Sequence, residues 1–339
     1  MQPYPVGKLP AEAMAALLAS IPQADPRVVL GPGIGHDAAV IDFGDRYLVT
    51  KSDPITFATD EIGWYAVQVN ANDVACLGAA PRWFVAAILL PEGRSDHALA
   101  ASIFRQMTDA CAEMGATLVG GHTEITHGLD RPIVVGAMLG EVARERLVRS
   151  DGARPGDALI LTKRIAVEGT AIIARELGER LRGSLPEALL RRAAAFLHEP
   201  GIGIVREAAI LTDTGHVHAM HDPTEGGVAG GLWELCAAAG VGAVVEAEAL
   251  PFYAETRAIC EALGLDPLGL IASGSLLAAV EAEATEAVLT ALHAAGIEAT
   301  RIGTVTAEAD LLLRERDGRL RPFPRFARDE IARLFGGEG

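Results

Sequence analysis

Two acidic residues near a lysine carry the clearest sign of chemistry in this sequence. Asp53 follows an apolar run that is typical of a strand, and Asp73 lies in an apolar stretch that is expected to form a helix over residues 61–77. No further basic residue occurs between Lys51 and Arg82. Hard divalent ions such as Mg²⁺ prefer carboxylate oxygens and commonly share them with phosphate. We therefore expect Asp53 and Asp73 to bind a cation rather than to form ion pairs.

Each of these residues also has a simpler interpretation. Asp53 precedes Pro54, which favours an extended backbone and is compatible with a turn. Asn72 and Asp73 are poor helix formers in the middle of an apolar helix, where they could serve only as hydrogen-bonding groups. Lys51 could neutralise a phosphate, or it could lie at the surface with its aliphatic part on apolar neighbours.

A glycine-rich segment precedes this region. Gly33 and Gly35 lie in the sequence Gly31-Pro32-Gly33-Ile34-Gly35-His36-Asp37, ahead of a predicted strand. Glycines let the backbone approach a ligand and offer N–H groups to phosphate. The segment is neither a Walker A loop nor a dinucleotide-binding fingerprint. An ordinary flexible loop is the alternative, with Asp37 as a turn cap.

Two further segments follow predicted strands. The first, Gly120-Gly121-His122-Thr123-Glu124, is expected as a loop after a strand over 116–119, a position where open α/β sheets bind ligands. His122 could act as a general base or only as a hydrogen-bonding residue. The second, Asp222-Pro223-Thr224-Glu225-Gly226-Gly227, places an acid before a helix N-terminus, which favours phosphate. Thr224 could cap this helix instead. His216 and His218 could pair on a metal or simply face solvent.

Composition excludes several classes of protein. The chain has 339 residues and a formal net charge of −16, so a broad basic surface for nucleic acid is not expected. Its four cysteines form no zinc-type spacing and are expected to be buried thiols. No signal-type segment or apolar run long enough to span a membrane is recognised. We expect a soluble, cytoplasmic protein.

Strand-like and helix-like segments alternate along the chain, which predicts an α/β (α+β) fold. A polar turn cluster rich in glycine and proline, Ser150–Pro155, indicates a domain boundary. We therefore predict two domains, over residues 1–150 and 151–339.

Taken in order, these segments resemble the superfamily of aminoimidazole ribonucleotide (AIR) synthase, selenophosphate synthetase, thiamine-monophosphate kinase and the hydrogenase-maturation factor HypE. The segments that carry the resemblance are GIGHDAAV, TKSDP, VNANDVACLGAAPRW, GGHTEIT and DPTEGGVAGGL. The HypE branch is the most similar. The resemblance implies a homodimer whose N-terminal sheet domains pair, with ATP held through Mg²⁺ by conserved acids.

The resemblance also implies roles for individual residues. Four acids match the metal-binding positions of the family: Asp37, Asp53, Asp73 and Asp222. The expected catalytic residues are Lys51, His122 and Asp222. The expected nucleotide-binding residues are Gly33, Gly35, Asn72, Gly120, Gly121, Thr123, Thr224, Gly226 and Gly227.

The expected activity is an ATP-dependent transfer of the γ-phosphate to an oxygen of an unidentified small-molecule or protein-borne acceptor. The HypE factor carries a carbamoyl group on a cysteine at its C-terminal end, whereas this sequence ends in Phe335-Gly336-Gly337-Glu338-Gly339. Two other interpretations stay open. One is a nucleotide-binding maturation or scaffold protein, acting with a maturation partner and without chemistry of its own. The other is a small-molecule kinase.

Overall fold

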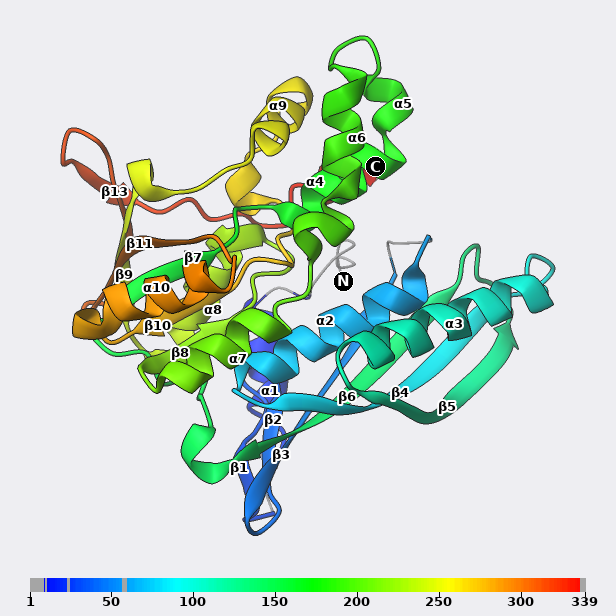
Figure 1. Cartoon of the computed structure of the whole chain (residues 1–339), viewed down its shortest axis with the longest axis horizontal. Helices are drawn as coiled ribbons and strands as arrows, with labels where there is room; N and C mark the ends of the chain where they lie inside the picture. The colour runs from blue at the N-terminus through cyan, green and yellow to red at the C-terminus, as the bar shows by residue number, and fades with distance from the viewer. Residues whose placement is uncertain (1–8, 10, 23–24, 57–59, 336–339) are drawn as a thin grey trace. The chain divides into compact units, whose positions relative to one another are not determined.

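The computed structural model describes residues 9, 11–22, 25–56 and 60–335 (Figure 1). These residues form two compact units. The N-terminal unit comprises residues 25–31 and 37–147, and the C-terminal unit comprises the described residues within 1–24, 32–36 and 148–339. Each unit contains one sheet, so the predicted mixed α/β architecture with two sheet-containing parts is confirmed.

The N-terminal unit is built on a six-stranded sheet in the order β1-β2-β3-β6-β4-β5. β4 and β5 are parallel, and the other neighbours are antiparallel. A hairpin at residues 43–46 joins β2 to β3. The strands are β1 (Val28–Leu30), β2 (Ala39–Asp42), β3 (Arg46–Ile55), β4 (Ala80–Pro91), β5 (Thr117–Thr126) and β6 (Ile133–Ala143). The short 3₁₀ helix η1 (Arg144–Arg146) follows β6.

Two helices of this unit, α2 (Ile62–Cys76) and α3 (His97–Glu113), lie side by side over one face of the sheet (Figure 1). α2 packs on β3, β4, β6 and α3, and Trp64 is its only residue that is not fully buried. A helix that is apolar on nearly all sides must be enclosed in this way. It ends at Leu77, and Gly78 follows with a φ of 73°, a backbone conformation that favours glycine.

The segment predicted as a loop at residues 120–124 is instead part of strand β5, so that prediction is wrong. The backbone stays paired with β4 through Thr126 after a register shift beside Phe84. Gly121 permits this pairing, because a Cβ atom there would lie 1.9 Å from the carbonyl oxygen of Ala86. The two glycines thus allow close strand contact and do not end the strand.

The C-terminal unit contains a seven-stranded sheet in the order β13-β12-β9-β11-β7-β10-β8. Only the β9–β12 pair is parallel. Its strands are β7 (Ala158–Thr162), β8 (Val217–His221), β9 (Gly242–Glu246), β10 (Leu277–Val280), β11 (Ala299–Thr306), β12 (Leu311–Arg314) and β13 (Leu320–Pro322).

The α-helices of the C-terminal unit are α1 (Ala11–Leu18), α4 (Val167–Glu176), α5 (Gly178–Leu181), α6 (Glu187–Ala195), α7 (Val205–Thr214), α8 (Gly227–Ala239), α9 (Ala254–Leu263), α10 (Thr285–Ala294) and α11 (Ala332–Phe335). Three helices of this unit, α7, α8 and α10, pack on the sheet, whereas α4, α6 and α9 pack on one another (Figure 1). The π-helical turn is η2 (Leu197–Gly201). The short 3₁₀ helices are η3 (Ala247–Ala249), η4 (Pro267–Gly269) and η5 (Ala282–Ala284).

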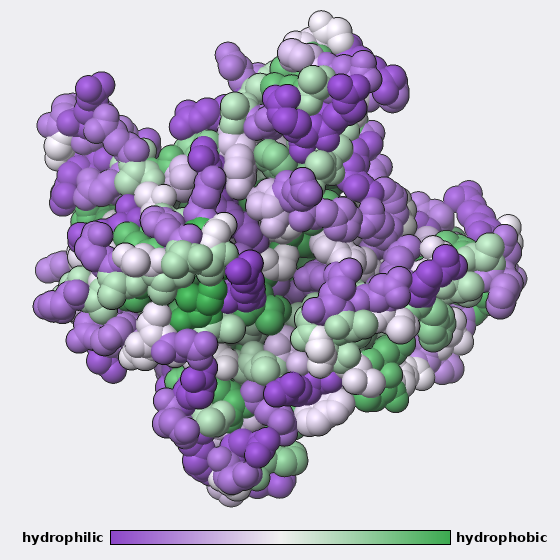
Figure 2. Space-filling model, in the orientation of Figure 1, coloured by the Kyte–Doolittle hydropathy of each residue, from purple (hydrophilic) through white to green (hydrophobic). Residues whose placement is uncertain are grey.

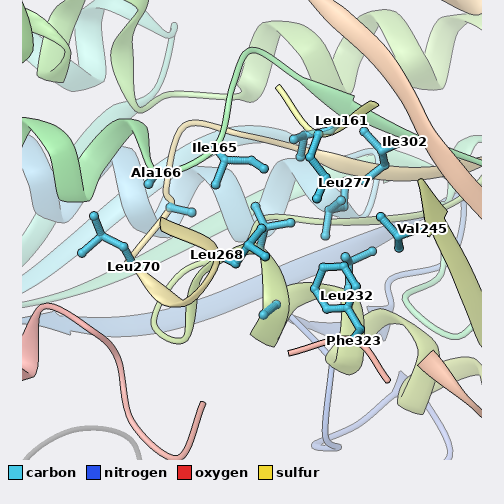
Figure 3. Close-up of a cluster of buried hydrophobic side chains, with 14 of the residues drawn as sticks. Leu161, Ile165, Ala166, Leu232, Val245, Leu268, Leu270, Leu277, Ile302 and Phe323 are labelled. Atoms are coloured by element: carbon cyan, nitrogen blue, oxygen red, sulfur yellow. The ribbon is translucent and has the colours of Figure 1, made fainter. Parts of the chain in front are cut away.

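Aliphatic side chains dominate the core of the C-terminal unit, as a low aromatic content predicts. Figure 3 shows Leu161 and Leu277 of the sheet with Leu232 of α8 and Leu268 and Leu270 of the connecting loop. These residues are buried, and their burial holds α8 and the loop against the sheet.

One ion pair is buried in this core. Lys163 Nζ lies 2.8 Å from Glu207 Oε1 and donates to the carbonyl oxygens of Gly201 and Gly203 at 3.1 and 2.7 Å. Both side chains are less than a tenth exposed. Each charge therefore depends on its partners, because an unpaired charge in such a place is costly.

Hydrophilic side chains predominate on the face shown in Figure 2, and the hydrophobic ones form separate small patches. No described helix combines the length and apolar character needed to cross a membrane.

The buried pair gives a stability prediction. Replacing Lys163 with methionine leaves the Glu207 carboxylate without its cation, and we expect the free energy of unfolding to fall by about 3–5 kcal/mol. Urea unfolding of the full chain measures this change. The double variant Lys163→Met/Glu207→Met removes both charges and should recover much of the loss.

The exposed pair between Arg314 and Glu246 is a matched control. Glu246→Gln breaks an ion pair of similar length, 2.7 Å, between half-exposed side chains, and should cost less than about 1 kcal/mol. Equal losses in Lys163→Met and Glu246→Gln would contradict the prediction.

Candidate functional site

The N-terminal unit brings Lys51, Asp53 and Asp73 together. Lys51 Nζ lies 3.2 Å from Asp73 Oδ1 and 3.3 Å from Asp53 Oδ2. Lys51 and Asp53 are two residues apart on β3, so both side chains lie on the same face of the sheet. This is the face that α2 covers, and α2 presents Asp73 there. Asp73 is buried, whereas Lys51 and Asp53 are partly exposed. The cluster is thus rooted in the core and open to solvent on one side.

The side chain of Asn70 fixes Asp53 from the same helix. Its Oδ1 accepts a hydrogen bond from the Asp53 N–H at 2.8 Å, and its Nδ2 donates to the Asp53 carbonyl oxygen at 3.3 Å and to the Ala66 carbonyl oxygen at 2.8 Å. Gly136 makes room for this contact, because a Cβ atom there would lie 2.5 Å from Asn70 Nδ2. Asn70 was not recognised in the sequence, although it lies one helical turn before Asp73.

The expectation that these acids form no ion pairs is wrong, because Lys51 itself pairs with both. The two carboxylates nevertheless fit Mg²⁺. They offer hard oxygen ligands, and both already face the positive charge of Lys51. A Mg²⁺ ion bound with phosphate would meet the same two negative charges. The two carboxylates that the sequence indicated as cation ligands therefore lie close enough to share one positive charge.

Asp37 lies at the same end of β3. Ala39 pairs with Thr50 in the antiparallel β2–β3 ladder, so the chain before β2 runs alongside Lys51 and Asp53. Asp37 is buried. Its predicted role as a metal ligand is compatible with this position. Asn72, also buried, is on α2 beside Asp73.

His122 is not brought to this cluster within the N-terminal unit. It pairs with Ala87, on the sheet face opposite α2, and β5 is three strands from β3. Three inter-strand spacings amount to roughly 14 Å. The side chain is 71% exposed and lies 3.4 Å from Glu124. Gly120, Gly121 and Thr123 belong to the same exposed strand.

Asp222 belongs to the C-terminal unit, where it follows β8 and is buried. The residue before it, His221, places Nε2 3.0 Å from Glu234 Oε2 of α8. The predicted glycine loop lies against the same helix, because a Cβ atom on Gly35 would come within 2.3 Å of the Glu234 carbonyl oxygen. Gly35 also has a φ of 73°. Close packing thus requires this glycine, without any ligand.

The turn after Asp222 is held by a residue from the C-terminal segment. Asp329 accepts hydrogen bonds from the backbone N–H groups of Gly226 at 2.7 Å, Ile271 at 3.2 Å and Ile331 at 2.8 Å. The N–H of Gly227 donates to the Thr224 carbonyl oxygen. Gly226 and Gly227 therefore already have acceptors for the N–H groups that were predicted to bind phosphate.

Two buried carboxyl groups near this turn were missed in the sequence. Burial above all, together with the nearby Glu225 and Asp329, raises the pKa of Glu168 to about 7, against the hydroxyl and N–H of Ser273, which lower it. Burial likewise raises the pKa of Asp329 to about 6, against its three backbone hydrogen bonds. A lone Glu in the first turn of a predicted helix gave no signal that it would be buried.

The alternative sites in the sequence have simpler structural explanations. His216 contacts Glu281 at 2.8 Å and His218 contacts Asp157 at 2.9 Å, so each histidine has its own carboxylate and they do not form a metal pair. All four cysteines are buried, as predicted. Burial raises the pKa of the Cys260 thiol to about 12, which disfavours the reactive thiolate.

Glu168 gives a pH-dependent prediction. A carboxyl group whose pKa is raised on folding does not lower the free energy of unfolding below about pH 4, because it is protonated in both the folded and the unfolded state. Above that pH it lowers the free energy of unfolding more and more, until the pH exceeds its pKa in the folded state. Wild type should therefore lose stability between about pH 4.5 and 7 relative to Glu168→Gln. The difference should approach about 3 kcal/mol, since each tenfold change in proton affinity is about 1.4 kcal/mol.

Urea unfolding at pH 5 and pH 8 measures this difference. Glu176→Gln, on the exposed end of the same helix, should differ from wild type equally at both pH values. A Glu168→Gln variant with no pH-dependent advantage would show that the Glu168 pKa is not raised.

Comparisons with known proteins agree with this architecture. The family model described as AIR synthase related protein, N-terminal domain, matches residues 35–142, and its C-terminal counterpart matches residues 154–314. The carbamoyl dehydratase HypE of Rhizobium leguminosarum bv. viciae is 35% identical over 268 residues, which cover 78% of this chain and 73% of the relative. A putative hydrogenase expression/formation protein of Methanocaldococcus jannaschii is 30% identical over 289 residues, which cover 81% and 82%.

Solved structures show the same relationship. HypE from E. coli superimposes with a TM-score of 0.73 at 26% identity, covering 95% of this chain and 99% of that one. HypE in complex with ATP gives a TM-score of 0.70 at 25% identity, with coverage of 91% and 89%. HypE in the HypE–HypF complex gives 0.72 at 27% identity, with coverage of 86% and 94%. The chain therefore belongs to the AIR synthase related protein family, in the group that includes the HypE carbamoyl dehydratases.

Proposed function

We propose that this chain is a Mg-ATP-dependent enzyme that transfers the γ-phosphate to an oxygen of an acceptor. The observation that carries the proposal is the cluster of Lys51, Asp53 and Asp73, in which two carboxylates and one ammonium meet between β3 and α2. The ATP complex of a HypE relative supports the choice of nucleotide. The name carbamoyl dehydratase supports an acceptor oxygen of the amide or carbonyl type.

In the proposed reaction, the carboxylates of the cluster and its ammonium group have different roles. Asp53 and Asp73 would hold the Mg²⁺ ion, which neutralises phosphate charge and orients the transferring group. Lys51 would then turn its ammonium from the carboxylates to a phosphate oxygen. Asn70 keeps Asp53 in place through its two backbone contacts, so that the ligand geometry is set before ATP arrives. The roles predicted for Asp37 and Asp222 stay part of this proposal.

We further propose that the N-terminal units of two copies pair through β5. This edge strand exposes Val119 and Ile125 at 54% and 59%, an unusual feature for a sheet edge facing water. The open sheet face beside it carries exposed Trp83 and partly buried Val85 and Leu89. A second copy would cover this apolar surface. It would also bring the exposed His122 beside the second copy.

A second function deserves a test because a HypE relative is found in a complex with HypF. In this alternative the chain binds ATP and a maturation partner but transfers no phosphate. Mg-ATP hydrolysis separates the two functions when it is followed with and without a panel of amides and carboxylic acids. Saturable ATP binding without ADP formation under all of these conditions would favour the binding function.

The phosphate-binding cluster predicts a specific loss. Lys51→Met and Asp73→Asn should each lower acceptor-stimulated ATP turnover by about 10²–10³-fold, because each removes a charge aimed at the transition state. Asp73→Asn should also weaken Mg-ATP binding in isothermal titration calorimetry. Asp45→Asn, on the exposed β2–β3 hairpin, is the matched control and should leave both unchanged. Full Mg-ATP affinity and turnover in Asp73→Asn would rule out this site.

The proposed dimer predicts a change of mass. Val119→Lys/Ile125→Lys places two charges on the β5 edge, and sedimentation should show monomers where wild type shows dimers. Phe43→Lys, which replaces another exposed apolar residue of the same unit on the far hairpin, should stay dimeric. A monomeric wild type, or a dimer that tolerates both charges on β5, would contradict pairing through this strand.

A further inference from the structure

Glu168 is a buried carboxyl group that the proposed phosphoryl transfer does not use. It lies in the first turn of α4 and is only 5% exposed. Ser273 interacts with the carboxylate through its hydroxyl and its backbone N–H. The other carboxylate oxygen, Oε2, is fully buried and has no hydrogen-bond partner among the described residues. A buried acceptor without a donor is costly, so the position calls for an explanation.

Two glycines near Glu168 let the N-termini of α4 and α8 pack closely against the loop that contains Leu268 and Leu270. A Cβ atom on Gly169 would lie 2.5 Å from Leu270 Cγ, and one on Gly227 would lie 2.5 Å from the Leu268 carbonyl oxygen. The first glycine follows Glu168 on α4, and the second begins α8. The N-termini of both helices therefore press against the same loop, which continues to Ser273. This arrangement sets Glu168 beside the turn that follows Asp222.

The charges that surround Glu168 are acidic. Glu225, of that turn, and Asp329, which holds the turn, both act on the Glu168 carboxyl group and favour its protonated form. Asp329 is committed to three backbone N–H groups. An anionic ligand would be repelled here. A group that donates hydrogen bonds, and a cationic group above all, would be attracted.

We propose that Glu168 Oε2 is the recognition point of a subsite in the C-terminal unit for a nitrogen-bearing hydrogen-bond donor, an amide or amine group. This subsite rests on the proposed function and deepens it by naming the residue that would recognise the nitrogen-bearing part of the acceptor. Ser273 orients the carboxylate from one side, and the donor N–H of the ligand bonds to the oxygen on the other. Glu168 is thus a specificity residue and takes no part in phosphoryl transfer.

Three small probes of similar size separate the possible ligand types: acetamide, methylammonium and acetate. Their binding to the full chain is measured without ATP by saturation-transfer NMR. Wild type should bind acetamide and methylammonium and should not bind acetate. Because no nucleotide is present, this result is independent of phosphoryl transfer. A failure of ATP turnover with intact probe binding would overturn the proposed function and leave the subsite standing.

Two substitutions at Glu168 give different expected results. Glu168→Gln keeps an acceptor oxygen but loses the charge, so methylammonium binding should fall by at least about tenfold while acetamide binding changes less. Glu168→Met is of similar length and has no strong acceptor, so both probes should lose binding. Glu176→Gln, on the same helix and exposed, is the control and should match wild type. Unfolding curves establish that each variant is folded.

The subsite assignment fails under either of two results. One is that acetate binds as well as acetamide. The other is that the nitrogen-bearing probes do not distinguish wild type, Glu168→Met and Glu176→Gln, either because they bind all three alike or because they bind none. In that case Glu168 Oε2 would have only a buried water as its partner. Acetamide bound in wild type and displaced by methylammonium, with both lost in Glu168→Met, would support the assignment.

Discussion

The burial of α2 is the constraint on which the candidate site depends. This helix is enclosed by the sheet and α3, so Asp73 cannot move away from the position that the helix gives it. A buried carboxylate needs a nearby positive charge or hydrogen-bond donors. Lys51 supplies the charge from β3, at 3.2 Å. The same requirement supports the proposed Mg²⁺ site, because a second cation would satisfy Asp73 as well as the first.

In the proposed function, Lys51 is therefore the partner of the two acids before the metal binds, and it is not a competitor of the metal. Its side chain is 23% exposed, and the flexible stem lets the ammonium reach beyond the two carboxylates. Asp53 is held by Asn70 through its backbone and cannot follow. Two fixed acids and one mobile base are what phosphoryl transfer needs, since the catalyst must mainly position charges that are already in place.

The sequence allowed much of this unit to be predicted, because its signals are local. The apolar helix with a polar pair and the acid before Pro54 lie within 40 residues of one another, and β3 and α2 follow one another in the chain. The pairing of Lys51 with both acids could not be predicted, since it depends on which face of β3 each side chain takes. The extension of β5 was missed because Gly120 and Gly121 indicate a loop, whereas contact with Ala86 explains Gly121. The binding of Mg²⁺ by the four predicted acids together stays a prediction.

The C-terminal unit shows why a buried acid needs its whole environment to be interpreted. Glu207 and Glu168 are equally buried helix residues of the same unit, at 4% and 5% exposure. Glu207 meets Lys163, whose ammonium also binds two backbone carbonyl groups, so its charge is satisfied by the fold alone. Glu168 meets Ser273 and two further acids, and one of its oxygens has no donor among the described residues. The first arrangement stabilises the core without a ligand. In the second, one buried oxygen has no donor from the described part of the fold, and this difference, which neither residue's sequence context reveals, is the physical basis for proposing a ligand at Glu168.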